Sequence, residues 1–286
     1  MSPLYRQLFE VLSRRYAAGE ARALAFLLLE EGFGVSRTDV YADKVRHFSA
    51  EEHQRLADMS RRVAEGEPVQ YVLGTAEFCG RVFRVTPATL IPRPETEELV
   101  ALCLDVVSRR PVPADRPLRL LDAGTGSGCI AVSLAAALPG AEVEAWDISE
   151  AALEVARDNA RRADVHVRFV RQDLLAACAT GDVFDCIVSN PPYVCESERG
   201  DMESHVLDHE PHSALFVPDD DPLRFYRALA ALGRRSLVPG GALLVEINRA
   251  YGAATADLMS AAGYADVRVH KDAFGNDRMV EAYVGE

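Results

Sequence analysis

Apolar residues recur at helical spacing along the first part of the chain. Ser49 and Glu52 add the spacing of a capping box before one of the apolar stretches. The stretches that show the repeat are 4–16, 20–34 and 49–66. This pattern predicts a small all-helical N-terminal domain over residues 1–75.

The next segment, residues 76–89, has a different pattern of residues. Phe and Val surround Gly80 in a short run, which predicts a β-hairpin linker. Pro94 then fits the first turn of a helix, where a backbone N–H is unbonded in any case. The glutamates that follow Pro94 favour the positive end of the helix dipole. A helix is therefore expected at the start of the third segment of the chain, residues 90–286.

From about residue 118, short apolar segments alternate with helical ones. The expected strands are 118–123, 142–147, 165–171, 183–189 and 242–248. The expected helices are 127–138, 149–162, 222–237 and 250–262. Such alternation predicts βαβ units, with a mainly parallel sheet covered by helices on both faces. The last residues break the pattern with two strands around a Gly-Asn turn. We therefore expect an α/β catalytic domain whose seven-stranded, Rossmann-like sheet ends in an antiparallel hairpin.

A glycine-rich segment, "LLDAGTGSGCIA", joins the first expected strand to its helix. Glycine at positions 124, 126 and 128 permits positive φ and lets a ligand approach the backbone. In a doubly wound sheet, ligands bind outside the carboxyl ends of the strands, where this loop lies. A dinucleotide fingerprint requires Gly or Ala at the position of Cys129, so a nicotinamide oxidoreductase is disfavoured. A ligand-binding loop is favoured over a plain tight turn.

The strand at 183–189 stops abruptly in "SNPPY". The two prolines remove backbone donors and make a rigid elbow. An amide or aromatic amine is a poor nucleophile, because its lone pair is delocalised. The side-chain oxygen of Asn190 and the carbonyl oxygen of Pro191 can accept its N–H bonds, and Tyr193 can pack against its plane. Orientation and electrostatic preorganisation would then supply most of the acceleration. A loop turn with a capping Asn is the structural alternative.

An acidic residue, Asp147, ends the strand that follows the glycine loop. A carboxylate there can accept hydrogen bonds from both hydroxyls of a cofactor ribose. A helix cap beside Ser149 is the competing structural role.

Five segments in order resemble the protein-(glutamine-N5) methyltransferase family, and more closely its release factor glutamine methyltransferase branch. They are "PVQYVLG", "LIPRPETEELV", the glycine loop, "NPPYV" and "HEPHSAL". The resemblance implies the S-adenosylmethionine-dependent methyltransferase fold. It further implies methyl transfer from S-adenosyl-L-methionine to the glutamine of the Gly-Gly-Gln motif in peptide-chain release factors, with the N-terminal helices docking the protein substrate. The chain departs from the family at "FVPDDDP", so substrate contacts are not carried over to 216–222.

The resemblance also assigns roles to individual residues. Ile148 would lie along the adenine, Asp173 would face its amino group, and Leu174 stands where many relatives carry an aromatic residue. The full cofactor-binding set is Asp122, Gly124, Thr125, Gly126, Ser127, Gly128, Asp147, Ile148, Asp173, Leu174 and Asn190. The catalytic and substrate-binding elbow is Asn190, Pro191, Pro192 and Tyr193. Arg93 and Glu95 would shape the entrance to the substrate-binding site, or form an ion pair at the start of a helix.

Composition and charge narrow the classes of function. The 286 residues carry a net charge of −13, which argues against a protein that grips nucleic-acid phosphates directly. The six cysteines form no CxxC pair and no Cys/His cluster at zinc spacing, so no metal site is expected. The sequence has no signal-peptide core and no apolar run of membrane length. We expect a cytoplasmic monomer that does not bind a membrane and whose partner is the protein substrate.

Three further functions remain as alternatives. The same chemistry could act on a ribosomal-protein glutamine, or on the N6 amino group of adenine in nucleic acid. The net negative charge and the lack of a basic recognition domain disfavour methylation of adenine in nucleic acid. A non-enzymatic assembly factor that keeps the fold is disfavoured by the intact elbow from Asn190 to Tyr193.

Overall fold

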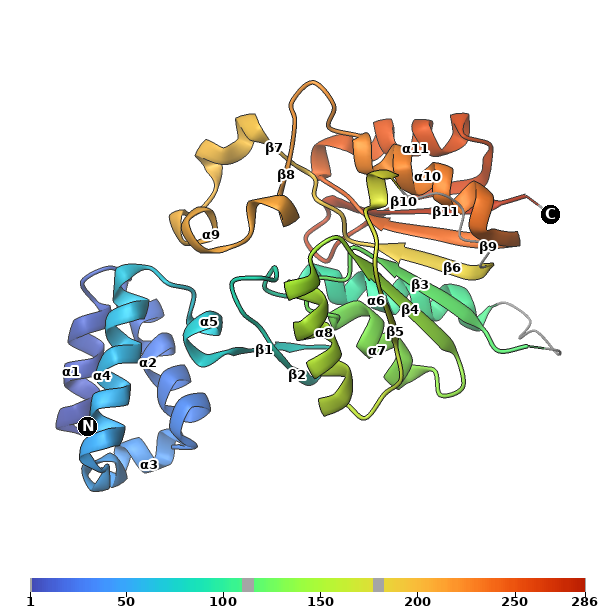
Figure 1. Ribbon diagram of the computed structural model, residues 1–286. Coiled ribbons are helices and arrows are strands. Elements are labelled where there is room, and N and C mark those ends of the chain that lie inside the picture. Colours follow the sequence, from blue (N-terminus) through green and yellow to red (C-terminus); the bar gives the residue numbers. More distant parts are fainter. Residues whose placement is uncertain (1, 110–115, 177–182, 286) are drawn as a thin grey trace. The chain divides into compact units, whose positions relative to one another are not determined.

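The computed structural model describes residues 2–109, 116–176 and 183–285. The chain divides into two compact units (Figure 1). The first consists of Met1–Thr75 together with Met202–Glu210, and the second of Ala76–Asp201 together with Pro211–Glu286. A short segment that follows the elbow in sequence is thus grouped with the N-terminal helices.

The first unit is a set of helices, of which those between residues 3 and 73 share one apolar core. Its helices are α1 (Pro3–Leu12), α2 (Ala18–Phe33), α3 (Arg37–Tyr41), η1 (Lys44–His47), α4 (Ala50–Glu65), α5 (Val69–Leu73) and α9 (Ser204–His209). The capping box predicted for α4 is confirmed, since Ser49 Oγ accepts from the Glu52 N–H at 3.2 Å and Glu52 accepts from the Ser49 N–H at 2.7 Å. A hydrogen bond from Arg15 to Ser204 Oγ, 2.8 Å long, ties α9 to the helices of this unit.

The second unit is built on a seven-stranded sheet, as the alternation of segments predicts. The sheet order is β10-β11-β9-β6-β3-β4-β5. The strands are β3 (Arg119–Ala123), β4 (Glu142–Asp147), β5 (Arg168–Arg171), β6 (Phe184–Ser189), β9 (Leu237–Glu246), β10 (Tyr264–Lys271) and β11 (Asp277–Val284). Strands β9, β6, β3, β4 and β5 are parallel, whereas β11 runs antiparallel to both of its neighbours.

Helices cover both faces of this sheet. They are α6 (Pro94–Ser108), α7 (Cys129–Ala137), α8 (Glu150–Arg162), α10 (Arg224–Ser236) and α11 (Gly252–Ala261). Successive strand residues face opposite layers: Leu120 packs with α6 and α7, and Leu121 packs with α10 and α11. Figure 1 shows α10 and α11 on one side of the sheet and α6, α7 and α8 on the other. None of the helices in the described part of the chain combines the length and apolar character needed to cross a membrane.

The hairpin expected after the first domain is present as β1 (Thr75–Phe78) and β2 (Arg81–Arg84). Its two-residue turn has positive φ at both Cys79 (48°) and Gly80 (67°), the conformation that matches strand twist in tight hairpins. Phe78 and Phe83 meet edge to face, with ring centroids 6.0 Å apart, inside the core of the second unit. The hairpin therefore packs as part of the sheet unit.

The expected strand at 165–171 is shorter than predicted. Asp164 adopts a positive φ of 54°, and the Val165 N–H bonds back to Ala160 O at 3.1 Å to end α8. The first residues after the helix therefore serve its C-terminal cap. Elements too short for periodicity were not predicted: β7 (Val194–Cys195), β8 (Phe216–Val217), η2 (Leu174–Ala176), η3 (Glu196–Asp201), η4 (His212–Ala214) and η5 (Arg249–Tyr251).

One buried side chain joins the hairpin, α8 and the glycine loop. Asn159 on α8 accepts from the Arg84 N–H at 2.7 Å, and it donates to Arg84 O at 2.9 Å and to Ser127 O at 2.8 Å. Only 2% of the Asn159 surface is exposed, so solvent has little access to these hydrogen bonds.

We expect Asn159→Ala to lower the free energy of unfolding by about 2–4 kcal/mol, because buried backbone groups lose their partners. The measurement is chemical denaturation followed by the fluorescence of Trp146, the single tryptophan, which is buried in the same unit. Arg161→Ala, a change on an exposed side of the same helix, is the control and should cost no more than about 0.5 kcal/mol. Equal stability of the two variants would contradict this role.

Candidate functional site

A cavity of about 540 Å³ lies in the second unit at the carboxyl edge of the parallel strands. Four of its walls follow consecutive strands of the sheet: 123–127 after β3, 146–149 after β4, 172–175 after β5 and 190–192 after β6. Residues 88–93 and Thr96, at the start of α6, form a further wall. Parallel strands present their carboxyl ends at one edge, so segments far apart in sequence share this cavity.

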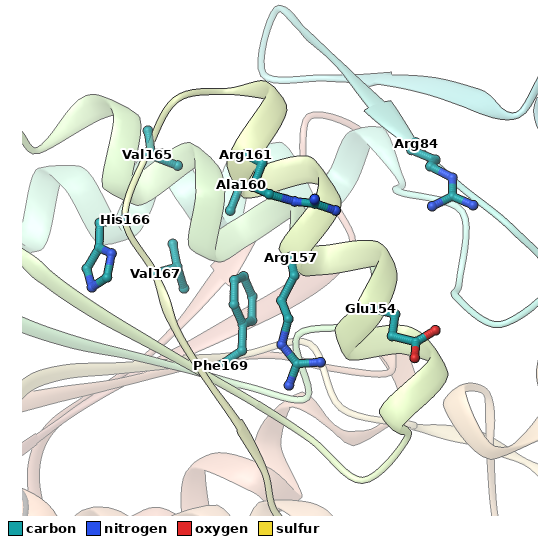
Figure 2. A pocket seen from close by; sticks show the side chains of 9 residues that line it. All are labelled: Arg84, Glu154, Arg157, Ala160, Arg161, Val165, His166, Val167 and Phe169. Carbon is teal, nitrogen blue, oxygen red and sulfur yellow. The ribbon is translucent and has the colours of Figure 1, made fainter.

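A second cavity, of about 610 Å³, lies between α8 and β5 (Figure 2). Its arginines are already engaged with carboxylates: Arg157 contacts Glu150 at 2.7 Å, and Arg161 and Arg84 both contact Asp158. It contains none of the residues singled out by the sequence. The cavity at the carboxyl edge is therefore the candidate site.

Two different physical reasons explain why glycine occupies these positions of the loop. All three have positive φ, at +83° for Gly124, +54° for Gly126 and +81° for Gly128. A Cβ on Gly128 would lie 2.9 Å from the Cβ of Ala156, so glycine lets the loop pack against α8. A Cβ on Gly124 or Gly126 would instead project into open space. These two positions leave the backbone of the cavity wall bare for a ligand.

Asp122 braces the glycine loop from below. It is fully buried, and its Oδ2 accepts from Thr125 Oγ1 at 2.6 Å and from the Ala131 N–H at 3.1 Å. Its Oδ1 has no hydrogen-bond partner among the described residues. Burial raises the pKa of this carboxyl to about 7. Asp122 and Gly128 do not line the cavity, whereas Thr125 and Ser127 do.

Asp147 lines the cavity and joins the glycine loop to the start of α8. Its Oδ2 accepts from the Gly126 N–H at 2.9 Å, and its Oδ1 accepts from the Ser149 N–H at 2.9 Å. Ser149 itself caps α8 by accepting from the Ala152 N–H. Each carboxylate oxygen has a second lone pair, so Asp147 can still accept hydrogen bonds from the hydroxyl groups of a ligand in the cavity. Burial raises its pKa.

The adjoining wall carries apolar and acidic groups together. Ile148 is 55% exposed at the cavity, an unusual state for a large aliphatic side chain. Asp173 accepts from the Leu175 N–H at 2.9 Å through Oδ1, and Leu174 also lines the cavity. Arg93 lines the cavity at the start of α6, while Glu95 is not among its described lining residues.

The elbow lies beside the glycine loop and is tied to it. Ser189 Oγ donates to Ala123 O at 2.5 Å, across the ends of β6 and β3. Asn190, Pro191 and Pro192 line the cavity. Tyr193 does not: its ring packs in the core, and its hydroxyl donates to Glu246 Oε1 at 3.0 Å.

Among the residues at the site that were not identified from the sequence, Thr96 and Glu246 are hydrogen-bonded to each other. Thr96 Oγ1 accepts from Asn190 Nδ2 at 3.1 Å and donates to Glu246 Oε2 at 2.7 Å. Glu246 ends β9 just as Asp147 ends β4, so an acid closing an apolar strand was the available signal. Thr96 carried no signal of its own beyond its place in "IPRPETE".

The cavity fits S-adenosyl-L-methionine by its chemistry. Gly124 and Gly126 leave the backbone open, Asp147 and Asp173 supply acceptors, and Ile148 offers an apolar surface for a planar base. Cavities that bind nucleoside cofactors combine an apolar lining with a few placed polar groups in this way.

Comparisons with known proteins agree with this geometry. Residues 4–74 match the family model described as the PrmC N-terminal domain, and residues 107–210 match the Methyltransferase small domain. The chain is 51% identical over 268 residues to the release factor glutamine methyltransferase of Bacteroides thetaiotaomicron, covering 93% of this chain and 94% of that protein. It is 37% identical to the enzyme of the same name from Flavobacterium psychrophilum, covering 96% of each.

Solved structures support the fold. A methyltransferase from Pyrococcus furiosus superposes with a TM-score of 0.53 at 18% identity, covering 80% of this chain and all of that chain (100%). The 16S rRNA N2 G1207 methyltransferase of Thermus thermophilus, solved with AdoMet and guanosine, gives a TM-score of 0.52 at 19% identity over 73% of this chain and 49% of its own. The predicted methyltransferase fold is confirmed, and the match to release factor glutamine methyltransferases supports the predicted cofactor, S-adenosyl-L-methionine.

The burial of Asp122 makes a test by pH possible. Its folded pKa of about 7 lies above the ordinary value of 3.8, so the folded state holds the proton more tightly than the unfolded state. Stability from this group is present at low pH and is lost as pH rises through about 7. Asp122→Asn has no charge to bury. We expect its Tm, relative to wild type, to rise between pH 5 and pH 8 by at least about 2–4 °C, the shift that 1 kcal/mol makes in a domain of this size. A constant difference would contradict the buried charge.

Proposed function

The chain belongs to the release factor glutamine methyltransferase family, and we propose that the cavity at the carboxyl edge is where it methylates its substrate. The enzyme transfers a methyl group from S-adenosyl-L-methionine to the side-chain nitrogen of a glutamine in peptide-chain release factors. The glutamine we assign is that of the Gly-Gly-Gln motif. The observation that carries the assignment of the site is the bond from Ser189 Oγ to Ala123 O, which joins the elbow to the glycine loop.

The cofactor half of the site consists of the glycine loop and the ends of β4 and β5. Gly124 and Gly126 allow close approach of the cofactor to the backbone, and Asp147 accepts the ribose hydroxyls. Ile148 and Leu174 flank the adenine, and Asp173 accepts from its amino group. Asp122 acts from beneath by holding the loop in shape through Thr125 and Ala131.

The substrate half consists of the elbow and the start of α6. The cofactor supplies an electrophilic methyl group on a positively charged sulfur. Asn190 Oδ1 and the carbonyl oxygen of Pro191 accept the two N–H bonds of the glutamine amide and direct its nitrogen at that methyl group. Held in this way, the nitrogen would take the methyl group as its bond to sulfur breaks, and one amide proton would leave to solvent. No strong base is needed, because orientation and preorganised acceptors lower the barrier.

We propose that Tyr193 supports the elbow instead of packing against the substrate amide as expected from the sequence. Its hydroxyl donates to Glu246 and its ring lies in the core, so it supports the elbow from behind. Asn248 adds to this support by donating to Tyr193 O at 3.2 Å. A rigid elbow keeps the acceptors on Asn190 and Pro191 in place.

The helical unit is proposed to dock the protein substrate. A glutamine in a short loop offers little binding surface, and a separate compact unit can contact the body of a release factor. Arg93 and Glu95, at the start of α6, are proposed to contact the segment that enters the site. We further propose that the enzyme is a monomer of the cytoplasm, where release factors act, and that it binds neither nucleic acid nor a membrane.

Substitutions at Asn190 and Asp147 should separate chemistry from cofactor binding. We expect Asn190→Ala to lower kcat by roughly 100-fold or more, the scale for one preorganised polar group, with little change in cofactor Kd. Asp147→Ala, the matched control, should raise cofactor Kd and leave kcat at saturation closer to wild type. The measurement is single-turnover methyl transfer to a release factor, with cofactor Kd from calorimetry. Wild-type transfer by Asn190→Ala, or label on a ribosomal protein or DNA instead of the release factor, would overturn the assignment.

Docking by the helical unit can be tested with two substrates. A shortened chain beginning at Ala76 should keep its kcat/KM on a short Gly-Gly-Gln peptide, which shows that the catalytic unit still folds. On an intact release factor we expect its kcat/KM to fall by at least about 10-fold, since the docking contacts are lost. Retention of full kcat/KM on the intact factor would rule out the docking role.

A further inference from the structure

A chain of hydrogen bonds runs from the cavity into the core of the second unit. Asn190 Nδ2 donates to Thr96 Oγ1 at 3.1 Å, and Thr96 Oγ1 donates to Glu246 Oε2 at 2.7 Å. Asn190 and Thr96 line the cavity, whereas Glu246 is fully buried. The chain joins the elbow, the first turn of α6 and the end of β9.

The charge on Glu246 fixes the direction of every bond in this chain. An ionised carboxylate has no proton to give, so it can only accept. The single hydroxyl proton of Thr96 is therefore committed to Glu246. Thr96 can then only accept from Asn190, which must turn its N–H group toward α6. The amide oxygen, Oδ1, is the group that Asn190 is left to present to the cavity.

We infer that Glu246 is a positioning residue that acts through Thr96 to fix the orientation of the Asn190 amide. The inference rests on the proposed function, in which Asn190 Oδ1 accepts an N–H bond of the substrate glutamine. Turned the other way, Asn190 would present a donor to a donor, and the glutamine nitrogen would be pushed out of line. Glu246 thus controls the reaction without touching the substrate.

The surroundings of Glu246 hold it in place and offset part of the cost of burying its charge. Tyr193 donates to the other oxygen, Oε1, at 3.0 Å, so both carboxylate oxygens are occupied. Burial raises the pKa of Glu246, whereas the hydrogen bonds from Thr96 and Tyr193 and the charge of Arg278 on β11 lower it. The remaining ionisable neighbours are Glu95 on α6, which also raises that pKa, and Tyr226 on α10.

The first test separates the hydroxyl of Thr96 from its volume. Thr96→Val keeps the shape and removes the hydroxyl, and Thr96→Ser does the reverse. We expect Thr96→Val to lower kcat about 5- to 10-fold, the size of one lost hydrogen bond in the transition state, with cofactor Kd unchanged. Thr96→Ser should stay within about twofold of wild type. Thr255→Val is the matched control, because Thr255 is buried on α11 with no described partner for its hydroxyl.

The second test asks whether Thr96 acts through Asn190. In an Asn190→Ala background there is no amide left to orient, so Thr96→Val should cause no further loss of kcat. A packing role predicts the opposite, an additional loss of similar size in both backgrounds. Single-turnover methyl transfer to a release factor at saturating cofactor measures all four proteins.

A third test uses the charge itself. Protonated Glu246 can donate to Thr96, and Thr96 can then donate to Asn190 Oδ1, which turns the acceptor away from the substrate. The kcat of wild type should therefore fall as pH drops through the raised pKa of Glu246. Glu246→Gln carries no titrating group there and should lose this acid limb. Asp122 titrates in both proteins, so the difference between their profiles isolates Glu246.

The outcomes distinguish this inference from the proposed function. If wild type methylates a release factor and Asn190→Ala does not, the function stands. Within that result, a wild-type kcat for Thr96→Val, equal losses for Thr96→Val and Thr96→Ser, or an unchanged acid limb in Glu246→Gln would each overturn the positioning role alone.

Discussion

Buried carboxylates at or near the carboxyl ends of parallel strands hold the glycine loop, the helix starts and the elbow of the site together. Asp122, near the end of β3, accepts from the glycine loop and the first turn of α7. Asp147, at the end of β4, accepts from the glycine loop and the start of α8. Glu246, at the end of β9, accepts from α6 and from Tyr193 of the elbow. Each acid is desolvated and accepts from two donor groups, and for Asp147 and Glu246 these donors come from segments that are not neighbours in sequence. These hydrogen bonds hold the cavity walls in shape, because a desolvated carboxylate that lost its donors would be costly.

This arrangement also explains how the two halves of the site stay in register. The cofactor half belongs to β3, β4 and β5, and the substrate half belongs to β6 and α6. The halves meet between β3 and β6, where Ser189 Oγ donates to Ala123 O. A transfer between two bound molecules depends on their relative placement to within a fraction of an ångström. Two adjacent strands of one sheet supply that placement more reliably than two loops would, because their register is fixed by the ladder between them.

The sequence predicts local features of this protein well and long-range ones poorly. Periodicity identified the sheet and its helices, and Gly124 and Gly126 identified the ligand edge, because each depends on residues close together in the chain. The bond between Thr96 and Glu246 joins positions 150 residues apart, and no local pattern announces it. Grouping of 202–210 with the N-terminal helices is likewise invisible in the sequence, since it depends on a contact between Arg15 and Ser204. Tyr193 was placed in the right motif, but which way its ring points is a property of the packed core.

An amide faces the substrate, and a carboxylate is linked to it through two hydrogen bonds. This arrangement follows from the charges involved in the reaction. A carboxylate in place of Asn190 would also accept an N–H bond, but its negative charge would attract the positive sulfur of the cofactor before the reaction. Such attraction stabilises the ground state and does not help the chemical step. A neutral amide avoids this, yet it can present either its oxygen or its nitrogen. Glu246, through Thr96, removes that ambiguity while its own charge stays in the core. The site thus obtains the directing power of a charge without exposing one to the reacting atoms.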